Sequence, residues 1–169
     1  MPVPESFQTA RLEGERIAPA HLPDLRVLHR DPKVMAELGG VRSDAETARY
    51  LARNLSHWDT HGFGVWMLCP KGGQNWIGRI VLRWLSTGTI DDVEIGFAFL
   101  PIYWGQGLAT EAAEFCLGVA QAELELRTVI GVTTPENLAS QRVLGKLGLR
   151  YESKVVVEQT RCLLHRVRW

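Results

Sequence analysis

A glycine-rich turn that opens directly into a helix constrains the fold of this chain more than any other feature. Residues 93–99 form an extended, mostly apolar run, which Phe99 closes and Pro101 prevents from continuing. After the turn, apolar residues recur at helical spacing over 109–122. The first N–H groups of a helix lack internal partners, and glycine lets the backbone approach a bulky group. This junction of strand, turn and helix therefore predicts a phosphate-binding site.

Two common phosphate-binding motifs do not fit this turn. A P-loop places Lys followed by Ser or Thr after its glycines, and no such pair follows Gly105 and Gly107. A dinucleotide-binding fingerprint has a third glycine where this sequence has Thr110, and an acidic residue that ends a strand about 20 residues later. The sequence has neither of these features.

The residues around the turn resemble the pyrophosphate loop of the GNAT acyltransferase superfamily, whose pattern is Q/R-x-x-G-x-G/A. Gly107 and Ala109 occupy the last two positions of that pattern, whereas Trp104 stands where Gln or Arg is usual. The longer string Tyr-Trp-Gly-x-Gly-x-Ala-Thr-Glu-Ala at 103–112, preceded by Glu-Ile-Gly-Phe at 94–97, is similar to the branch that contains the ribosomal-protein N-terminal acetyltransferases. The full string is far more specific than the glycine turn alone.

A second segment supports the resemblance. A β-branched run at 128–133 precedes a helix that Asn137 is placed to cap and Gly148 is placed to end. Members of the superfamily carry the same Asn-x-x-Ser…Lys-Leu-Gly pattern where the pantetheine arm of coenzyme A leaves the cleft. The resemblance covers the chain from Thr9 to about Val157.

Extended and helical stretches alternate along the chain, which predicts a three-layer α/β fold. The resemblance implies a single GNAT-like domain over residues 1–169, with a mixed, mostly antiparallel sheet of about seven strands, splayed central strands and about four flanking helices. Strands are expected at 11–17, 64–68, 76–85, 93–99, 128–133, 152–158 and 161–167. A broken helical region is expected at 20–29 and 32–38, and further helices at 43–58, 110–122 and 137–147.

The resemblance also implies that the chain binds acetyl-CoA as a co-substrate and needs no metal. In the superfamily two neighbouring strands splay apart, so that the amides of pantetheine pair with free backbone of the fourth strand. A backbone N–H there, in this chain that of Phe99, stabilises the oxyanion. The residues expected to bind the coenzyme are Phe97, Ala98, Phe99, Gly105, Gln106, Gly107, Leu108, Ala109, Thr110, Asn137 and Ser140.

Acyl transfer to an amine requires a proton acceptor, because an amine with a pKa of about 10.4 is mostly protonated at pH 7. Glu94, which shares a strand face with Gly96, is the leading candidate, and Glu158 and water are the alternatives. Many relatives use a tyrosine to protonate the leaving thiolate, and Leu144 stands at that position. The resemblance to the ribosomal-protein branch therefore implies Ser140 as the acid. Glu94 as a surface carboxylate and Ser140 as an ordinary first-turn serine are the structural alternatives.

Other polar and aromatic residues show less specific patterns. The five histidines have no metal-ligand spacing, and His61, beside a glycine-containing loop, is the one expected near the acceptor side. Trp58, Trp84 and Trp104 are candidates to wall an acceptor pocket, and Glu111 fits the first turn of a helix. The three cysteines have neither disulfide nor zinc spacing and are expected to be packing residues.

Composition narrows the range of partners. Of the 169 residues, 19 are Lys or Arg and 19 are Asp or Glu, so the net charge is zero and no basic run indicates nucleic-acid binding. The N-terminus lacks a secretion signal and no run reaches about 18 apolar residues, so we expect a cytoplasmic protein that does not bind membranes. We expect a monomer or homodimer. The implied partner is an amine acceptor.

Three classes of function fit these observations. The expected one is an N-acetyltransferase that moves an acetyl group from acetyl-CoA to a primary amine, of a protein N-terminus or a small molecule, by direct attack in a ternary complex. The second is a non-catalytic coenzyme A-binding regulatory domain, which the missing tyrosine favours. The third is an enzyme of a different class that uses a nucleotide phosphate.

Overall fold

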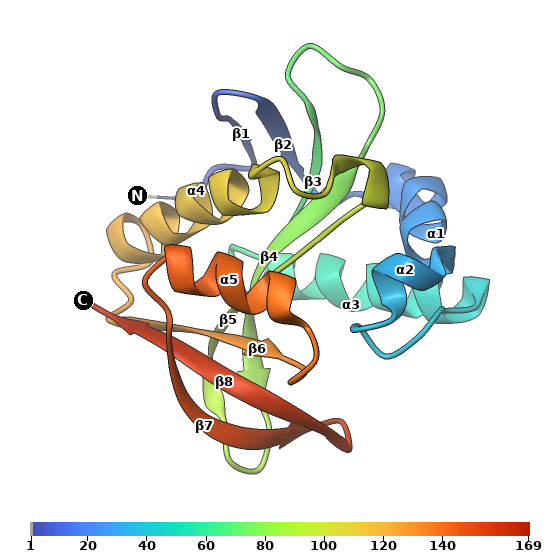
Figure 1. Ribbon diagram of the computed structural model, residues 1–169. Helices are drawn as coiled ribbons and strands as arrows, with labels where there is room; N and C mark the ends of the chain where they lie inside the picture. The colour runs from blue at the N-terminus through green and yellow to red at the C-terminus, as the bar shows by residue number, and fades with distance from the viewer. Residues whose placement is uncertain (1) are drawn as a thin grey trace.

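The computed structural model describes residues 2–169 and shows an open eight-stranded sheet with helices on both faces (Figure 1). The strand order across the sheet is β1-β2-β3-β4-β5-β6-β8-β7. The strands are β1 (Ser6–Gln8), β2 (Leu12–Arg16), β3 (Val65–Pro70), β4 (Gly78–Ser86), β5 (Asp91–Phe99), β6 (Thr128–Thr133), β7 (Arg150–Val157) and β8 (Thr160–Arg168). The helices are α1 (Leu22–Arg30), α2 (Pro32–Met35), α3 (Asp44–His61), α4 (Leu108–Ala122) and α5 (Leu138–Lys146), with short 3₁₀ turns η1 (Pro19–His21) and η2 (Pro101–Tyr103).

The predicted three-layer α/β architecture with a mostly antiparallel sheet is confirmed, with eight strands and five α-helices over residues 2–169. The strand that sequence reasoning missed is β1, which pairs antiparallel with residues 13–15 of β2. It was missed because three residues are too few to show an alternating pattern. Helix α4 begins at Leu108 rather than at the predicted residue 110. None of the helices over 2–169 is both long and apolar enough to cross a membrane.

Local capping interactions begin and end the helices where the sequence predicts. The Ser43 hydroxyl accepts the Glu46 N–H at 3.2 Å, and the Glu46 carboxylate accepts the Ser43 N–H at 2.7 Å, so α3 starts with a capping box. At α5, the Asn137 side chain accepts the N–H of Ser140 at 3.1 Å. Gly148, two residues after α5, has φ of +84°.

Helices α1 to α3 cover one face of the sheet, and α4 and α5 cover the other. On the first face, Ala98 of β5 packs in a buried cluster with Leu28 of α1 and Met35 of α2. On the opposite face, Leu144 of α5 lies so close to β6 that a Cβ on Gly131 would meet it at 2.6 Å. Because side chains alternate along a strand, each residue of β4 and β5 belongs to one of these two faces.

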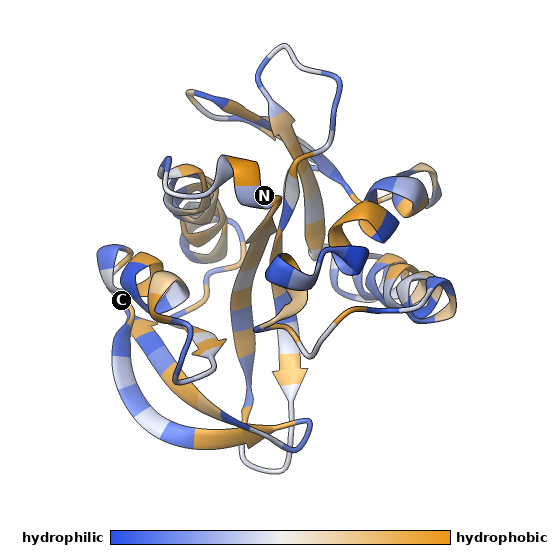
Figure 2. Cartoon of the chain, turned by 45° about the vertical axis from the view of Figure 1, so that its right-hand side comes forward, coloured by the Kyte–Doolittle hydropathy of each residue, from blue (hydrophilic) through white to orange (hydrophobic). Residues whose placement is uncertain are grey.

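The core between the sheet and α4 is apolar and closely packed. Figure 2 shows hydrophobic residues concentrated along the central strands, where Ile80, Leu82 and Ile95 are almost completely buried. Phe115 of α4 stacks on Phe7 of β1, with ring centroids 3.8 Å apart. Burial of large apolar side chains of this kind is the main favourable contribution to folding. It also fixes α4, and with it the glycine-rich turn, against the sheet.

Strands β5 and β6 separate from each other inside the sheet. They run parallel, and their pairing consists of a single residue pair, Glu94 with Ile130, although β5 remains paired with β4 along 91–99. The second half of β5 therefore has a partner on one side only. The splayed central strands predicted from the resemblance are found at this point of the sheet.

The backbone of β5 presents unpaired groups to this gap. Leu100 donates its N–H to the carbonyl of Ile77 at 2.8 Å, so its amide points toward the β4 side. In an antiparallel pair successive residues alternate in the direction of their N–H groups. The N–H groups of Phe97 and Phe99 therefore point away from β4 and into the gap between β5 and β6.

Candidate acetyl-coenzyme A and acceptor site

The glycine-rich turn holds its backbone open at the start of α4. Gly105 and Gly107 both have left-handed φ angles, +72° and +78°, which side-chain-bearing residues rarely adopt. Gly107 is the residue immediately before Leu108, the first residue of α4, and no side chain caps the helix there. The first N–H groups of α4 are thus left to an external acceptor, which gives the turn the geometry of an anion-binding site.

Glu111, in the first turn of α4, ties the turn to the N-terminal strands. Its carboxylate accepts the Thr9 hydroxyl at 2.5 Å and the Arg11 N–H at 2.8 Å, and it forms an ion pair with the Arg11 guanidinium at 2.7 Å. Arg11 in turn donates to the carbonyl of Gln106 at 2.7 Å. Beyond the helix-dipole role predicted for it, Glu111 therefore braces the turn and holds a guanidinium beside it.

Trp104 occupies the position where the family pattern has Gln or Arg. Its indole N–H donates to the carbonyl of Phe99 at 2.7 Å, so the side chain anchors the turn to the end of β5. The ring is half exposed. The structure places it next to the glycine-rich turn, and its role in walling an acceptor pocket remains a prediction.

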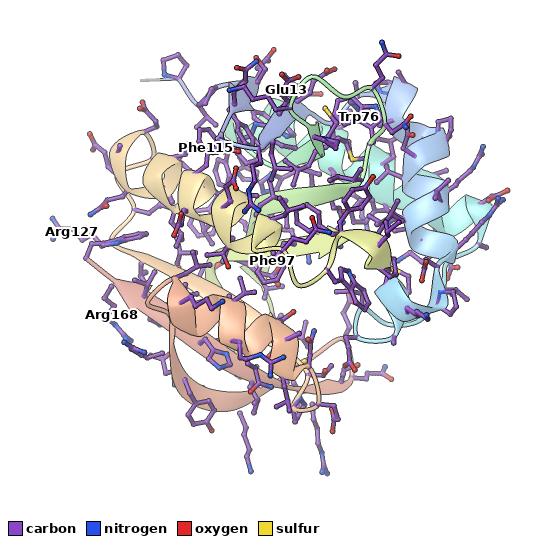
Figure 3. The ribbon with its side chains drawn as sticks, turned by 45° about the horizontal axis from the view of Figure 1, so that its top comes forward. Glu13, Trp76, Phe97, Phe115, Arg127 and Arg168 are labelled. Atoms are coloured by element: carbon purple, nitrogen blue, oxygen red, sulfur yellow. The ribbon has the colours of Figure 1, made fainter. Side chains whose placement is uncertain are left out.

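The three β5 residues predicted to contact coenzyme A differ in what their backbone offers. Phe97 and Phe99 direct their amides into the gap, and Figure 3 shows Phe97 beside α4. Ala98 is paired with Arg79 of β4, so its N–H points into the sheet. Its side chain packs under α1 and α2. Only alternate residues of β5 can therefore present an amide to a ligand in the gap.

Glu94 lies where β5 and β6 still pair, on the face covered by α1 to α3. Its side chain is 11% exposed, and one carboxylate oxygen is 3.1 Å from the Nε of Arg83 on β4. Glu94 chiefly, and Glu158 more weakly, raise the pKa of Arg83 above its ordinary value. Gly96, the next residue on this face, packs closely against β4, because a Cβ at this position would lie 3.1 Å from the Val81 side chain. A partly buried, oriented carboxylate can receive a proton.

Ser140 lies one helical turn before Leu144 on α5, and the two residues differ in burial. The backbone N–H of Ser140 is taken up by Asn137, whereas its hydroxyl forms no hydrogen bond within the described residues 2–169. Leu144 is 1% exposed and fills the core beneath Gly131. The position that holds a tyrosine in many relatives therefore contributes to packing, and the half-buried Ser140 hydroxyl remains available.

Glu158 stands at the tip of the β7–β8 hairpin in a strained conformation. Glu158 and Gln159 have φ of +46° and +67°, a region that hairpin turns usually fill with Asn or Gly. Glu158 also lines a cavity of about 440 Å³ together with residues from the start of α3. This hairpin tip therefore faces the helices that cover the Glu94 face.

His61 and the two remaining tryptophans lie elsewhere. The ring of His61, at the end of α3, is 4.5 Å from that of the half-buried His57 and 6.5 Å from that of Trp84 on β4. Trp58 is 3% exposed and donates its indole N–H to Val65 at 2.9 Å. Side-chain alternation puts Trp84 on the opposite side of β4 from Arg83. These aromatic residues thus do not surround Glu94.

Sequence reasoning missed a group of arginines on the α1–α3 face, which we call the arginine cluster. The guanidinium groups of Arg42 and Arg79 lie 5.0 and 5.3 Å from the ring centre of Tyr50. Burial, followed by the neighbouring charges of Arg79 and Arg53, holds the pKa of Arg42 below its usual value. The cluster consists of Arg42, Arg49, Arg53, Arg79 and Arg83. The sequence pattern that could have predicted this cluster is the presence of Arg79 and Arg83 four residues apart, and thus on one face, in an otherwise apolar strand.

His29 lies beneath this cluster. It is completely buried, with Thr47 at 3.0 Å from Nδ1 and Arg42 at 3.1 Å from Nε2. Burial first, and then the charges of Arg42 and Arg79, lower its pKa to about 3. The imidazole is therefore neutral and acts as an internal support for the helices above the site.

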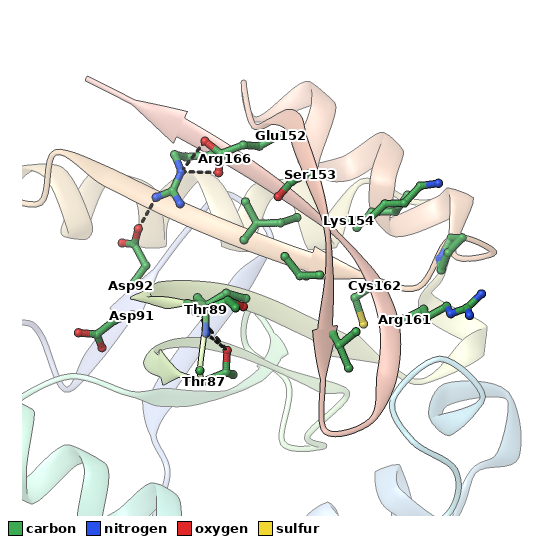
Figure 4. Close-up of a pocket in the computed structure, with 17 residues that line it drawn as sticks. Thr87, Thr89, Asp91, Asp92, Glu152, Ser153, Lys154, Arg161, Cys162 and Arg166 are labelled. Atoms are coloured by element: carbon green, nitrogen blue, oxygen red, sulfur yellow. Dashed lines mark hydrogen bonds and ion pairs between the residues drawn. The ribbon is translucent and has the colours of Figure 1, made fainter.

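A second, larger cavity of about 1060 Å³ lies between the β4–β5 turn and the β7–β8 hairpin (Figure 4). Arg166 closes one side of it by pairing with Asp92 of β5 and with Glu152 of β7. Cys162 lines its wall, and burial, followed by the charge of Glu94, raises the pKa of this thiol. Cys162, in the wall of this cavity, is therefore close enough to Glu94 for the carboxylate charge to affect the pKa of its thiol.

Comparison with known proteins places this arrangement in a family. A model described as an acetyltransferase (GNAT) domain matches residues 11–150. The chain belongs to the GNAT acetyltransferase family. Over 158 residues it is 32% identical to the FsC-acetyl coenzyme A-N(2)-transacetylase of Aspergillus fumigatus, an alignment that spans 86% of this chain and 65% of that protein.

Solved structures of acetyltransferases share the fold over nearly the whole chain. The acetyltransferase from Agrobacterium tumefaciens superposes with a TM-score of 0.87 at 23% identity, covering 100% of this chain and 96% of that one. A ribosomal L7/L12 alpha-N-protein acetyltransferase, solved in complex with coenzyme A, gives a TM-score of 0.78 at 15% identity and covers 97% and 98%. The splayed sheet and the turn before α4 are therefore set within a GNAT fold.

Proposed function

We propose that this GNAT protein is an N-acetyltransferase that uses acetyl-CoA to acetylate a primary amine. The observation that carries the proposal is the continuity between the amides of Phe97 and Phe99 and the open turn at Gly107. Coenzyme A has amide groups in its pantetheine arm followed by a pyrophosphate, and the chain offers sites of matching chemistry in that order. The fungal relative is named an N(2)-transacetylase, and the L7/L12 enzyme is named for acetylating an α-amino group, which supports an amine acceptor.

The residues around the turn fit the coenzyme. The left-handed glycines leave the N–H groups of Leu108, Ala109 and Thr110 to the pyrophosphate, and Arg11 adds a positive charge beside them. Gln106 takes part through its backbone, because its carbonyl holds Arg11 and its side chain donates to the Ile102 carbonyl. When bound, the coenzyme supplies an acetyl thioester as the electrophile.

Glu94 removes a proton from the acceptor ammonium, directly or through water, and so frees the nitrogen lone pair for attack on the carbonyl carbon. Arg83 keeps the carboxylate oriented at 3.1 Å. The Phe99 N–H donates to the carbonyl oxygen as negative charge develops there. As the C–N bond forms and the C–S bond breaks, the nitrogen loses its second proton to solvent and Ser140 protonates the sulfur. The proton that Glu94 accepted then returns through solvent to Ser140, which restores both side chains. The net products are an acetamide, a free thiol and one proton.

The assignment of the turn is tested by placing a β-branched side chain at Gly107. Gly107→Val should abolish measurable acetyl-CoA binding in calorimetry, because the backbone can no longer approach the pyrophosphate. Gly72→Val is the matched control, since Gly72 has the same left-handed geometry, φ of +73°, in the β3–β4 turn with open space around it. Equal coenzyme affinity in both variants would contradict the site.

A non-catalytic coenzyme A-binding domain is the second candidate, and the burial of Leu144 in place of an acid favours it. The two candidates differ in thiol release. Wild-type protein incubated with acetyl-CoA and a panel of amines, including amino acids, polyamines and peptides with free N-termini, should release free thiol in an amine-dependent manner. Tight acetyl-CoA binding without thiol release above the rate without amine would favour the regulatory domain.

A further inference from the structure

Arg79 is a buried cation without a counterion. It is 6% exposed, and the arginine side chain emerges from β4 beneath α1 to α3. Within residues 2–169 no carboxylate forms an ion pair with it, and its buried Nε has no hydrogen-bond partner. Buried charges in proteins are normally paired, because an uncompensated one is strongly unfavourable. Such a group is expected where a ligand supplies the missing charge.

An unsatisfied hydroxyl lies in the same place. Tyr50 is 1% exposed, and its buried hydroxyl has no hydrogen-bond partner in the described part of the chain. Arg42 and Arg79 both contact its ring, and the tyrosine also contributes to raising the pKa of Arg83, after the larger effect of Glu94. Two guanidinium groups therefore lie against the ring of a tyrosine whose own hydroxyl has no partner in that part of the chain.

Arg42 links the buried pair of Arg79 and Tyr50 to a cavity that Arg79 and Tyr50 do not themselves line. The cavity of about 440 Å³ is lined by Arg42, Arg49, Arg53, Glu46, Ala52 and Glu158. Glu46 is engaged with Ser43 in the α3 capping box, and Glu94 is engaged with Arg83. Of the five members of the arginine cluster, only Arg83 has a carboxylate in contact within the described residues 2–169, and Arg79 is the most deeply buried of the unpaired members. A chain with zero net charge thus concentrates unpaired positive charge beside its proposed proton acceptor.

We infer that the acceptor carries a carboxylate in addition to its amine, and that Arg79, Arg42 and the Tyr50 hydroxyl bind that carboxylate. The inference rests on the proposed function, because it names the acceptor class of the same site. Glu94 receives the amine, and Arg79 lies four residues before Arg83 on the same face of β4. From the rise of a β-strand, the Cα atoms of Arg79 and Arg83 are about 13 Å apart, and their side chains can shorten the distance between the groups that they hold. An amino acid or a short acidic peptide has this combination of groups.

The first experiment compares acceptors that differ only in the carboxylate. Acetyl-CoA turnover is measured with L-alanine against L-alaninamide, with 4-aminobutyrate against 4-aminobutanamide, and with a peptide whose second and third residues are Asp against the same peptide with Asn. In at least one pair, kcat/KM should be roughly ten- to a hundredfold higher for the carboxylate, the range expected for charged hydrogen bonds. The pair that responds identifies whether the carboxylate belongs to an amino acid or a peptide.

The second experiment uses Arg79→Met, which removes the guanidinium and keeps an apolar stem. Because the charge is unpaired in the free protein, this variant should melt no lower than wild type. It should lower kcat/KM for the carboxylate acceptor to the value for the carboxamide and leave the carboxamide unaffected. Arg127→Met, at an exposed arginine next to β6, is the control and should keep the wild-type preference.

A binding measurement separates this inference from the proposed function. Thermal stabilisation by N-acetyl-L-alanine and N-acetyl-4-aminobutyrate, without coenzyme, should be present in wild type and absent in Arg79→Met. Two results would overturn the inference without contradicting the proposed acetyltransferase activity. One is wild-type turnover with equal kcat/KM for the carboxylate and carboxamide acceptors, and the other is a carboxylate preference that Arg79→Met retains. Carboxylate-specific stabilisation without any turnover would sustain a carboxylate-binding site at Arg79 and overturn the proposed function.

Discussion

Glu94 is held by Arg83 at the last residue pair that β5 and β6 share, so its carboxylate is fixed beside the opening of the gap. If it accepts the proton, Glu94→Gln should preserve acetyl-CoA affinity and lower kcat by about a hundred- to ten-thousandfold, the usual effect of losing a general base. The loss should shrink toward pH 10, where the amine is already neutral. Steady-state kinetics from pH 6 to 10 provide the measurement.

Glu158→Gln is the control for this variant, because Glu158 is the other carboxylate near Arg83. We expect it to change the acceptor KM with little effect on kcat. A rise in KM alone in Glu94→Gln would mean that Glu94 binds the cationic acceptor without taking its proton. Wild-type kinetics in Glu94→Gln together with a large loss in Glu158→Gln would move the base to the hairpin tip.

Ser140 offers a hydroxyl with no hydrogen-bond partner in the described chain, while its backbone N–H serves the helix cap. Ser140→Ala should therefore leave the fold and acetyl-CoA affinity unchanged. It should lower kcat, because protonation of the sulfur matters in the transition state. Ser56→Ala on the exposed side of α3 is the control. An unchanged kcat in Ser140→Ala would mean that this serine has only a structural role in the first turn of α5 and that solvent is the acid.

The residues of the turn could be predicted from the sequence because their chemistry is local. Gly105 and Gly107 are needed where the backbone becomes left-handed, and the helix begins at the next residue. Arg79 could not be predicted in the same way. An arginine in a strand is normally solvated, and only the packing of α1 to α3 over β4 makes this one buried.

Helices α1 and α3 are joined through a buried histidine. His29 of α1 contacts Thr47 of α3, and its pKa is lowered to about 3 in the folded protein. Between pH 6.5 and 3 the unfolded chain binds a proton at His29 that the folded chain does not. The free energy of unfolding should therefore fall with decreasing pH by up to about 1.4 kcal/mol per unit from this group. The contribution is fully present above pH 6.5.

Urea unfolding at pH 7 and pH 5 measures this effect. His29→Gln should lose less stability than wild type over that interval, by up to about 2 kcal/mol. His61→Gln, at an exposed histidine at the end of α3, should behave as wild type. If the free energy of unfolding fell equally in wild type and His29→Gln, the folded protein would bind the proton at His29 as readily as the unfolded chain does.

Helices and strands that have a local sequence pattern could be predicted, whereas a strand that depends on pairing with a distant segment could not. The capping box of α3 and the Asn137 cap of α5 involve residues three apart, so their sequence patterns suffice. Strand β1 exists because it pairs with β2, and its three residues show no pattern alone. The place where β5 and β6 part was available from family resemblance, since no local pattern encodes the loss of a neighbouring strand.

Charge is balanced over the whole molecule and unbalanced on one of its faces. The 19 basic and 19 acidic residues led us to disfavour a strongly polyanionic partner. Folding brings arginines from α3, β4 and the segment before α3 together, so that the α1–α3 face acquires a positive centre. A single carboxylate satisfies this centre without requiring a polyanion, which reconciles the net charge with the local one.

The parting of β5 and β6 gives the sheet an edge in its interior. Unpaired strand edges at the outside of proteins invite other chains to add a strand, and proteins usually shield them. Here the amides of Phe97 and Phe99 have no strand partner within the described residues and point toward the β6 side of the sheet. The interior edge therefore lies between two strands of the same sheet. It can pair with the amide groups of a ligand, and it is not an outer edge to which another protein molecule can add a strand.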